Sequence, residues 1–310
     1  MNAISARGLR KSYDDKVVLD GIDLDVKQGS VFALLGPNGA GKTTIVNILS
    51  TLVAPDAGNA TVAGSDLADD PHGIRRAIGV TGQFSAVDSL LNGEENLMLM
   101  ADLHHLPRNV GRARATELLA RFDLTDAAKK VPTTYSGGMQ RKLDLAMTLV
   151  GEPKVIFLDE PTTGLDPRSR RTMWDIIRRL VAGGVTIFLT TQYLDEADEL
   201  ADRIALLDHG RIIAEGTPEE LKRQVPGGHV KLTFTDNTAL RQTAFHLESA
   251  IADDEALTLQ VPTDGSVASL RSLLDRLDGV AVDGIAMHAP DLDDVFLSLT
   301  GRQTEAEAVT

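Results

Sequence analysis

Residues 36–44 read Gly36-Pro37-Asn38-Gly39-Ala40-Gly41-Lys42-Thr43-Thr44. The apolar run Val31 to Leu35 stands before them, as is typical of a buried parallel strand, and Ile45 to Leu49 continues after them as a helix. The glycines, the lysine and the first threonine have the spacing G-x-x-x-x-G-K-[ST]. A loop of this spacing between a strand and a helix predicts an α/β fold that binds a nucleotide by its phosphates.

Each residue type in this loop has its own chemical task. Glycines let the backbone curl so that successive N–H groups point at phosphate oxygens, and the helix N-terminus adds partial positive charge. Lys42 is expected to reach the β- and γ-phosphates as a point charge, and the Thr43 hydroxyl is expected to ligate Mg²⁺. The loop therefore predicts a bound nucleotide together with Mg²⁺.

Composition narrows the class of protein. The chain has 310 residues, enough for an α/β core and a second, smaller domain. It has no cysteine, no hydrophobic signal segment and no apolar run of membrane-spanning length. A net charge of −14 argues against a nucleic-acid partner and against direct docking on anionic lipid. We expect a cytoplasmic protein that another protein must hold if it acts at a membrane.

Two further residues near the loop have open roles. Tyr13 precedes the loop, where an aromatic ring either stacks on an adenine or merely packs, and its position favours stacking. Gln83 ends a predicted strand that starts at Ile78. It is either an ordinary exposed side chain or an amide oxygen for Mg²⁺ or for an attacking water.

A second glycine-rich turn, Ser136-Gly137-Gly138, opens a predicted helix that runs through Leu149. Ser136 is a good N-cap, and glycines at a helix start leave N–H groups facing outward. The turn is therefore either an ordinary capped helix or a second phosphate site. The distinction matters because one γ-phosphate cannot lie at both turns of a single copy.

Two carboxylates follow the apolar strand Val155 to Leu158. Asp159 and Glu160 stand at its carboxyl end, where α/β sheets place their ligands. Asp159 is expected to bind Mg²⁺ through water, and Glu160 to accept a proton from the water that attacks the γ-phosphate. The tight turn Gly164-Leu165-Asp166-Pro167 comes next.

The end of the chain predicts a separate small unit. Pro226-Gly227-Gly228 has the composition of a linker, and strand-like and helical segments follow it. We expect a nucleotide-binding domain over residues 1–225, with a helical subdomain at about residues 88–150. An accessory α+β domain is expected over residues 229–300, and a disordered tail over residues 301–310.

The order of these motifs resembles the nucleotide-binding subunit of an ABC transporter, over about residues 4–223. The resemblance implies a P-loop NTPase fold with a RecA-like core, an antiparallel β subdomain and a helical subdomain. It also implies a head-to-tail homodimer with two ATP molecules between the copies. Each ATP would contact residues 36–44, Gln83, Asp159 and Glu160 of one copy, and Ser136, Gly137 and Gly138 of the other. Gln83 would join Thr43 and Asp159 at the metal, and Asp166 would lie at the dimer interface with Ser136 and Gly138.

Further runs narrow the resemblance to the daunorubicin-resistance type of drug exporter. They are Thr190-Thr191-Gln192-Tyr193-Leu194-Asp195-Glu196-Ala197, Glu215-Gly216-Thr217-Pro218-Glu219-Glu220-Leu221-Lys222 and Leu292-Asp293-Asp294-Val295-Phe296-Leu297, with Tyr135 before the Ser-Gly-Gly turn. This resemblance implies an ATPase subunit that drives export of a drug-like or other amphipathic compound. The compound would pass through a separate polytopic membrane permease, with this chain on the cytoplasmic side of the cell membrane.

Gln192 departs from the family pattern, which most often has a histidine there in contact with the γ-phosphate. A glutamine amide can donate a hydrogen bond but cannot take up a proton at neutral pH. Glu160 is then the only base expected, with Gln192 as a hydrogen-bonding neighbour.

Two other functions compete with transport. A soluble ABC-type ATPase acting on ribosomes or DNA is disfavoured by the acidity of the chain and by the absence of a second cassette or a cysteine-rich module. A P-loop kinase or GTPase of another family would leave Ser136-Gly137-Gly138 unexplained.

Overall fold

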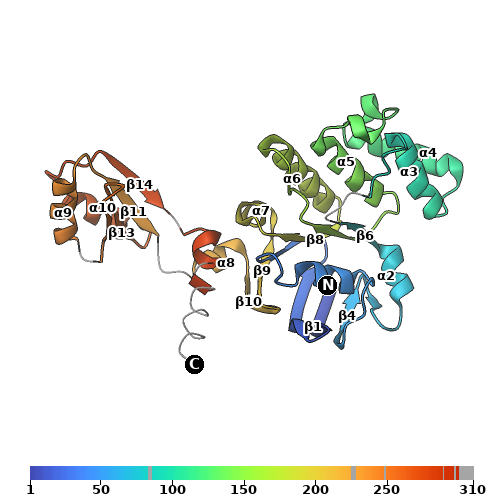
Figure 1. Ribbon diagram of the computed structural model, residues 1–310, viewed down its shortest axis with the longest axis horizontal. Coiled ribbons are helices and arrows are strands. Elements are labelled where there is room, and N and C mark those ends of the chain that lie inside the picture. Colours follow the sequence, from blue (N-terminus) through green and yellow to red (C-terminus); the bar gives the residue numbers. More distant parts are fainter. Residues whose placement is uncertain (83–85, 225–227, 248, 289, 297, 300–310) are drawn as a thin grey trace. The chain divides into compact units, whose positions relative to one another are not determined.

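The computed structural model describes residues 1–82, 86–224, 228–247, 249–288, 290–296 and 298–299 (Figure 1). The chain divides into two compact units, Met1–Pro218 and Glu219–Thr310. The division falls a few residues before the predicted linker, Pro226-Gly227-Gly228, of which only Gly228 is among the described residues. The predicted tail, residues 301–310, lies outside them.

A six-stranded sheet forms the centre of the first unit. Its order is β10-β9-β3-β8-β7-β6, with β3 at Val31–Leu35, β6 at Ile78–Thr81, β7 at Val155–Asp159, β8 at Thr186–Thr191, β9 at Arg203–Asp208 and β10 at Arg211–Gly216. Neighbours are parallel except β9 and β10, which form an antiparallel hairpin. β3, β7 and β8 are buried along their whole length, which explains the apolar runs at residues 31–35, 155–158 and 187–189 within them.

A smaller antiparallel sheet is built from strands that come before and after the phosphate loop in the chain. Its order is β2-β1-β4-β5, with β1 at Asn2–Tyr13, β2 at Lys16–Lys27, β4 at Ala57–Val62 and β5 at Ser65–Asp66. One hydrophobic cluster joins this sheet, helix α1 (Lys42–Leu49) and the six-stranded sheet. The sequence did not predict β1, because its pairing with β2 shifts between Ala6 and Leu9 and so breaks the apolar alternation.

A group of helices lies between β6 and β7 in the chain (Figure 1). It contains α3 (Gly93–Leu103), α4 (Arg108–Arg121), the short 3₁₀ turns η1 (Thr125–Ala127) and η2 (Pro132–Thr134), and α5 (Gly137–Thr148). Asn92 and Glu95 form a capping box at the start of α3, and Ser136 caps α5 as predicted. Leu97, Leu118 and Leu143, from α3, α4 and α5, are fully buried.

Three further helices complete the first unit. They are α2 (Pro71–Ala77), α6 (Pro167–Ala182) and α7 (Leu194–Leu200). The arginines of α6 do not simply face solvent, because Arg170 forms an ion pair with Asp195 of α7 at 2.8 Å and Arg178 forms one with Glu199. Met173 and Ile177, also on α6, are buried.

In its described residues the second unit contains one antiparallel sheet, two longer helices and a helical segment at residues 292–296. The sheet has the order β12-β13-β11-β14, with β11 at His229–Thr233, β12 at Ile251–Asp253, β13 at Thr258–Pro262 and β14 at Gly284–His288; the helices are α9 (Asn237–His246) and α10 (Val267–Arg276). α8 (Pro218–Lys222) spans the division between the units. The sequence did not predict β12 or β14, which expose their apolar residues instead of alternating them. Nowhere in the described part of the chain is there a helix long and apolar enough to cross a membrane.

Candidate functional site

The phosphate loop is held by close packing against two strands. A Cβ on Gly36 would lie 2.3 Å from the carbonyl oxygen of Leu207 in β9. A Cβ on Gly41 would lie 2.7 Å from Leu19 Cδ2 in β2, and Gly41 also has a φ of +112°. Only glycine fits at both positions, so the curl of the loop is fixed by its neighbours.

The side chain of Lys42 packs against the backbone of its own loop. Its side chain is 5% exposed, and Nζ donates hydrogen bonds to the carbonyl oxygens of Gly36 at 2.8 Å and Pro37 at 3.1 Å. The Glu160 carboxylate lies 3.7 Å from the same nitrogen. Burial lowers the pKa of Lys42, and the charges of Glu160 and Asp159 oppose that change. The ammonium group is thus held where phosphate oxygens would enter the loop.

Thr43 and Asp159 meet at the start of α1, although they are 116 residues apart in the chain. Thr43 Oγ1 donates to Asp159 Oδ2 at 2.9 Å, and the buried Thr190 hydroxyl donates to the other carboxylate oxygen. A hydroxyl beside a carboxylate is an oxygen set that suits a hard divalent cation. The arrangement therefore fits the Mg²⁺ role expected for Thr43 and Asp159.

Glu160 leaves the sheet directly after β7 with a φ of +50°, which is uncommon for a residue with a side chain. Its N–H donates to the Thr190 carbonyl oxygen at 3.1 Å, so the adjacent strand holds this turn. Its carboxylate accepts a hydrogen bond from Thr163 Oγ1 at 3.2 Å and faces Lys42. A carboxylate in this position can take a proton from a water molecule beside the phosphates.

A cleft of about 440 Å³ opens over these residues. Tyr13, at the end of β1, lines it together with Lys42, Thr43 and Glu160. The ring of Tyr13 is 45% exposed, and Lys11 Nζ lies 5.6 Å from its centroid. The structure thus brings Tyr13 to the same cleft as the phosphate loop, with ring surface left for a base.

Gln192 follows β8 at the same edge of the sheet. The carbonyl oxygen of Thr191, one residue earlier, accepts the N–H of Gly36 at 3.4 Å, and the Thr191 hydroxyl accepts the N–H of Tyr193 at 2.9 Å. Gln192 itself, the next residue after Thr191, is half-buried. The other predicted glutamine, Gln83, lies outside the described residues.

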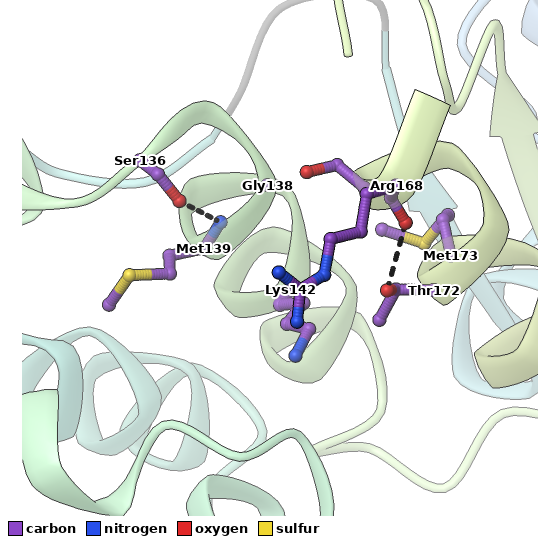
Figure 2. A pocket seen from close by; sticks show the side chains of 8 residues that line it. Ser136, Gly138, Met139, Lys142, Arg168, Thr172 and Met173 are labelled. Carbon is purple, nitrogen blue, oxygen red and sulfur yellow. Dashed lines mark hydrogen bonds between the residues drawn. The ribbon is translucent and has the colours of Figure 1, made fainter. Parts of the chain in front are cut away.

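The Ser136 turn lies at a separate cleft. Ser136 Oγ accepts the N–H of Met139 at 3.3 Å, and Ser136 and Gly137 are exposed at the start of α5. Lys142 and Arg168 line a cleft of about 140 Å³ beside this turn, and Figure 2 shows their side chains together with Ser136. This cleft shares no lining residue with the cleft over the phosphate loop. One copy therefore has two separate clefts, one at the phosphate loop and one at the Ser136 turn.

Asp166 belongs to the same surface as the Ser136 turn. It caps α6 by accepting the N–H groups of Arg168 and Ser169, each at 3.0 Å, and it accepts the Ser169 hydroxyl at 2.6 Å. These hydrogen bonds lower the pKa of Asp166, and the bond from the Ser169 hydroxyl has the largest effect. A Cβ on Gly138 would lie 2.7 Å from Ser169 Oγ, so α6 packs directly against the turn.

Two charged residues, the mostly buried Arg141 and the fully buried Glu196, have no role that was predicted from the sequence. The Glu196 carboxylate accepts the Thr162 hydroxyl at 2.8 Å and the Trp174 indole N–H at 3.1 Å. Thr162 lies two residues beyond Glu160, so Glu196 supports the turn after the carboxylate. No local pattern marks either residue, because the loop groups that they bind, such as Gly82 and Thr162, lie far away in the chain.

A fold and a site of this kind define an ABC-type ATPase. The family model described as ABC transporter matches residues 19–163. Together with the relatives below, this match shows that the chain belongs to the ABC transporter family and is one of its ATP-hydrolysing, ATP-binding subunits.

Relatives cover almost the whole chain. The daunorubicin resistance ATP-binding protein DrrA3 of Streptomyces coeruleorubidus is 48% identical over 96% of this chain and 96% of its own length. The daunorubicin/doxorubicin resistance ATP-binding protein DrrA of Streptomyces peucetius is 44% identical over 98% and 94%. The Nod factor export ATP-binding protein I of Ralstonia nicotianae is 39% identical over 97% and 94%. The predicted membership in the daunorubicin-resistance type is confirmed.

Solved structures confirm the predicted fold class. An ATP-binding subunit of an ABC transporter has 30% sequence identity and a TM-score of 0.64, over 72% of this chain and 92% of its own. A dimeric ATP-binding cassette in a post-hydrolysis state, with ADP and Pi bound, has 26% identity and a TM-score of 0.63, over 69% and 98%. The family therefore binds adenine nucleotide and forms dimers.

Tyr13→Ala should weaken ATP binding and leave the fold intact. Stacking of a base on an aromatic ring contributes about 1–3 kcal/mol, so the Kd for ATP should rise by about fivefold or more. Tyr13→Phe should bind as the wild type does, and Val17→Ala, an exposed residue outside the cleft, is the control. Equilibrium dialysis with ATP gives the Kd, and an unchanged value for Tyr13→Ala would mean that the ring only packs.

Glu196 gives a prediction about stability and pH. Burial raises the pKa of Glu196, against hydrogen bonds from Thr191, Thr162 and Trp174. In the unfolded chain a glutamate has a pKa of about 4.3. Between the unfolded and the folded pKa the native state binds more protons, so the contribution of this group to stability falls as pH rises.

Glu196→Gln removes this titration while keeping the shape of the side chain. The free energy of unfolding of the variant minus that of the wild type should therefore increase from about pH 4 to about pH 7. Urea unfolding followed by the fluorescence of Trp174, the only tryptophan, measures it. Glu199→Gln, on the exposed side of α7, should not show this increase. A difference that stays constant with pH would contradict the prediction.

Proposed function

We propose that this ATPase powers the export of a drug-like or other amphipathic compound through a separate membrane permease. The proposal is supported by the names of relatives that match over nearly the full chain, which refer to daunorubicin and doxorubicin resistance and to Nod factor export. The net charge of −14 disfavours direct lipid binding, so contact with the permease would hold the chain at the cytoplasmic side of the membrane.

The observation that carries the mechanism is the separation of the two half-sites within one copy. The phosphate loop and Glu160 line one cleft, and the Ser136 turn borders another. In the proposed head-to-tail homodimer, Ser136, Gly137 and Gly138 of a second copy close over the nucleotide bound to the loop. Asp166 packs beside that turn and belongs to the same interface. The dimeric cassette among the similar structures supports this arrangement.

Within each composite site the residues of the loop bind and orient ATP. Lys42 and the loop N–H groups hold the β- and γ-phosphates, and Tyr13 stacks on the adenine. Thr43 and Asp159 supply oxygens for Mg²⁺, which neutralises phosphate charge when it is bound. We assign Gln83 to the metal or to the attacking water, as the family resemblance implies.

Glu160 accepts the proton of the attacking water in this proposal. Gln192 stands where most of the family has a histidine, and its amide can donate a hydrogen bond to the γ-phosphate but does not titrate near neutral pH. Proton transfer then depends on Glu160 alone, and we expect hydrolysis to be slow. Closure of the dimer on ATP and its reopening after hydrolysis would move the permease.

A soluble ABC-type ATPase acting on ribosomes or DNA is not favoured. The relatives are named for resistance and export, and the acidity of the chain opposes contact with nucleic acid.

Glu160→Gln should bind ATP and fail to turn it over. Loss of a general base lowers the rate by about 10²- to 10⁴-fold, while the contacts of the loop with the phosphates remain. Phosphate release and ATP retention on the isolated protein measure the two effects. Glu199→Gln makes the same chemical change away from the cleft and should hydrolyse ATP at the wild-type rate. If Glu160→Gln hydrolyses ATP as fast as the wild type, Glu160 is not the general base.

The same variant tests the transport part of the proposal. Tagged Glu160→Gln protein should recover one polytopic membrane protein from detergent-solubilised host membranes in the presence of Mg-ATP. Less should be recovered without nucleotide, because closure of the dimer is proposed to depend on ATP. Recovery of ribosomes in place of a membrane protein would favour the soluble ATPase instead.

A further inference from the structure

Arg141, in the second turn of α5, binds the backbone of two loops at once. Its guanidinium donates hydrogen bonds to the carbonyl oxygens of Pro161 at 2.9 Å, Gly82 at 3.0 Å, Asp159 at 3.2 Å and Glu160 at 3.3 Å. Its side chain is 12% exposed. A single side chain therefore holds the peptide groups around the catalytic carboxylate and the last described residue before Gln83.

Asp144, one turn further along α5, completes this arrangement. Its side chain is 3% exposed, and Oδ2 accepts a hydrogen bond from Arg141 at 3.2 Å. Its other oxygen, Oδ1, accepts the N–H of Ala86 at 3.2 Å. The two residues thus bind Gly82 and Ala86, which stand on either side of the segment that carries Gln83.

A contribution to the overall stability of the fold does not account for a buried ion pair such as Arg141 and Asp144. Burial lowers the pKa of Arg141 and raises that of Asp144, and the attraction between the two charges opposes both shifts. Buried ion pairs are often no more stabilising than apolar residues of similar size. Arginine supplies donors in a rigid plane, which can serve several fixed carbonyl oxygens together. The geometry therefore favours a role in positioning the backbone.

The pair connects residues that serve different composite sites. Glu160 and Gln83 are proposed to act on the nucleotide bound by their own copy. The Ser136 turn, at the start of the same helix as Arg141 and Asp144, is proposed to act on the nucleotide bound by the second copy. A helix is stiff over the short distance from Ser136 to Asp144, so movement of the turn is transmitted to the bound backbone.

We propose that Arg141 and Asp144 couple the two ATP sites of the dimer, by holding the Ser136 turn, the Glu160 backbone and the flanks of Gln83 as one body. This inference rests on the proposed head-to-tail homodimer. Arg141 is a positioning residue, since its hydrogen bonds go to backbone carbonyls and to Asp144. Engagement of the turn by one nucleotide then sets the position of the carboxylate at the other.

The double variant Arg141→Gln/Asp144→Asn tests the pair without leaving a lone buried charge. Its Kd for ATP should stay within about twofold of wild type, and kcat should fall by at least about tenfold. Arg178→Gln/Asp175→Asn is the matched control, because that pair has the same spacing on a helix and the same 3.2 Å separation but is exposed. The control should keep the wild-type kcat. If the double variant does not fold, Arg141→Lys keeps the charge beside Asp144, loses the planar donors and should show the same fall.

Mixed dimers separate coupling from local support of Glu160. One copy carries Glu160→Gln, so only the site with the other copy's Glu160 turns over. The copy with the intact Glu160 also carries Ser136→Ala, in the turn that acts only at the other nucleotide, and this change is made with and without the double change in the same copy. Two different affinity tags allow each mixed dimer to be purified, and phosphate release gives its turnover.

Coupling requires Ser136→Ala to lower turnover at the intact site by at least about fivefold when Arg141 and Asp144 are present, and by less than about twofold when both are replaced. An equal effect in both backgrounds, or no effect in either, overturns the inference. Wild-type homodimers and Glu160→Gln homodimers are assayed in parallel. If the wild type does not hydrolyse ATP, or if Glu160→Gln matches it, the proposed function itself fails. If those two behave as expected and the double variant behaves as its exposed control, only the coupling inference fails.

Discussion

The register in which β3, β8 and β7 pair determines where the residues of the candidate site lie. Leu35 pairs with Thr191, and Asp159 pairs with Thr190, so the three strands end together at one edge of the sheet. Because side chains alternate along a strand, a slip of one residue in β7 would turn Asp159 away from Thr43. The apolar residues that fill these strands set the register through the core. The packing of the core therefore also fixes the geometry of the site.

Buried polar groups then fix the residues that leave this edge. Thr190 is fully buried and binds Asp159 on one side and the N–H of Glu160 on the other. Glu196 holds Thr162 just beyond the carboxylate, and Arg141 holds the carbonyl groups between them. Such groups are costly to bury without hydrogen-bond partners, so the bonds that they form favour one arrangement of the loops.

The motifs proposed to contact the nucleotide could be found in the sequence because each is short and carries its own context. Residues 36–44 lie between an apolar strand and a helix, and Asp159 and Glu160 end an apolar run, so their placement on the sheet follows from local sequence. Arg141 and Glu196 could not be predicted in this way. A charged residue in a helix resembles a solvent-exposed one in sequence, and backbone carbonyls in distant loops leave no motif. The bulge in β1 and the exposed strand β14 were missed for a related reason, because neither keeps the apolar alternation of a half-buried strand.

The departure at Gln192 makes this network more important. In the proposed mechanism Glu160 is the only group that can take up the proton, so its carboxylate must lie within hydrogen-bonding distance of the attacking water. Yet Glu160 has a φ of +50°, a conformation that costs about 1–3 kcal/mol unless its surroundings impose it. Its N–H is bound by Thr190 of the adjacent strand, and its carbonyl oxygen is bound by Arg141. The two bonds hold the peptide groups on either side of the strained residue, one from the sheet and one from the helix that begins at Ser136. Because Arg141 belongs to that helix, the proposed coupling needs only a small movement of the helix to shift the strained residue and its carboxylate.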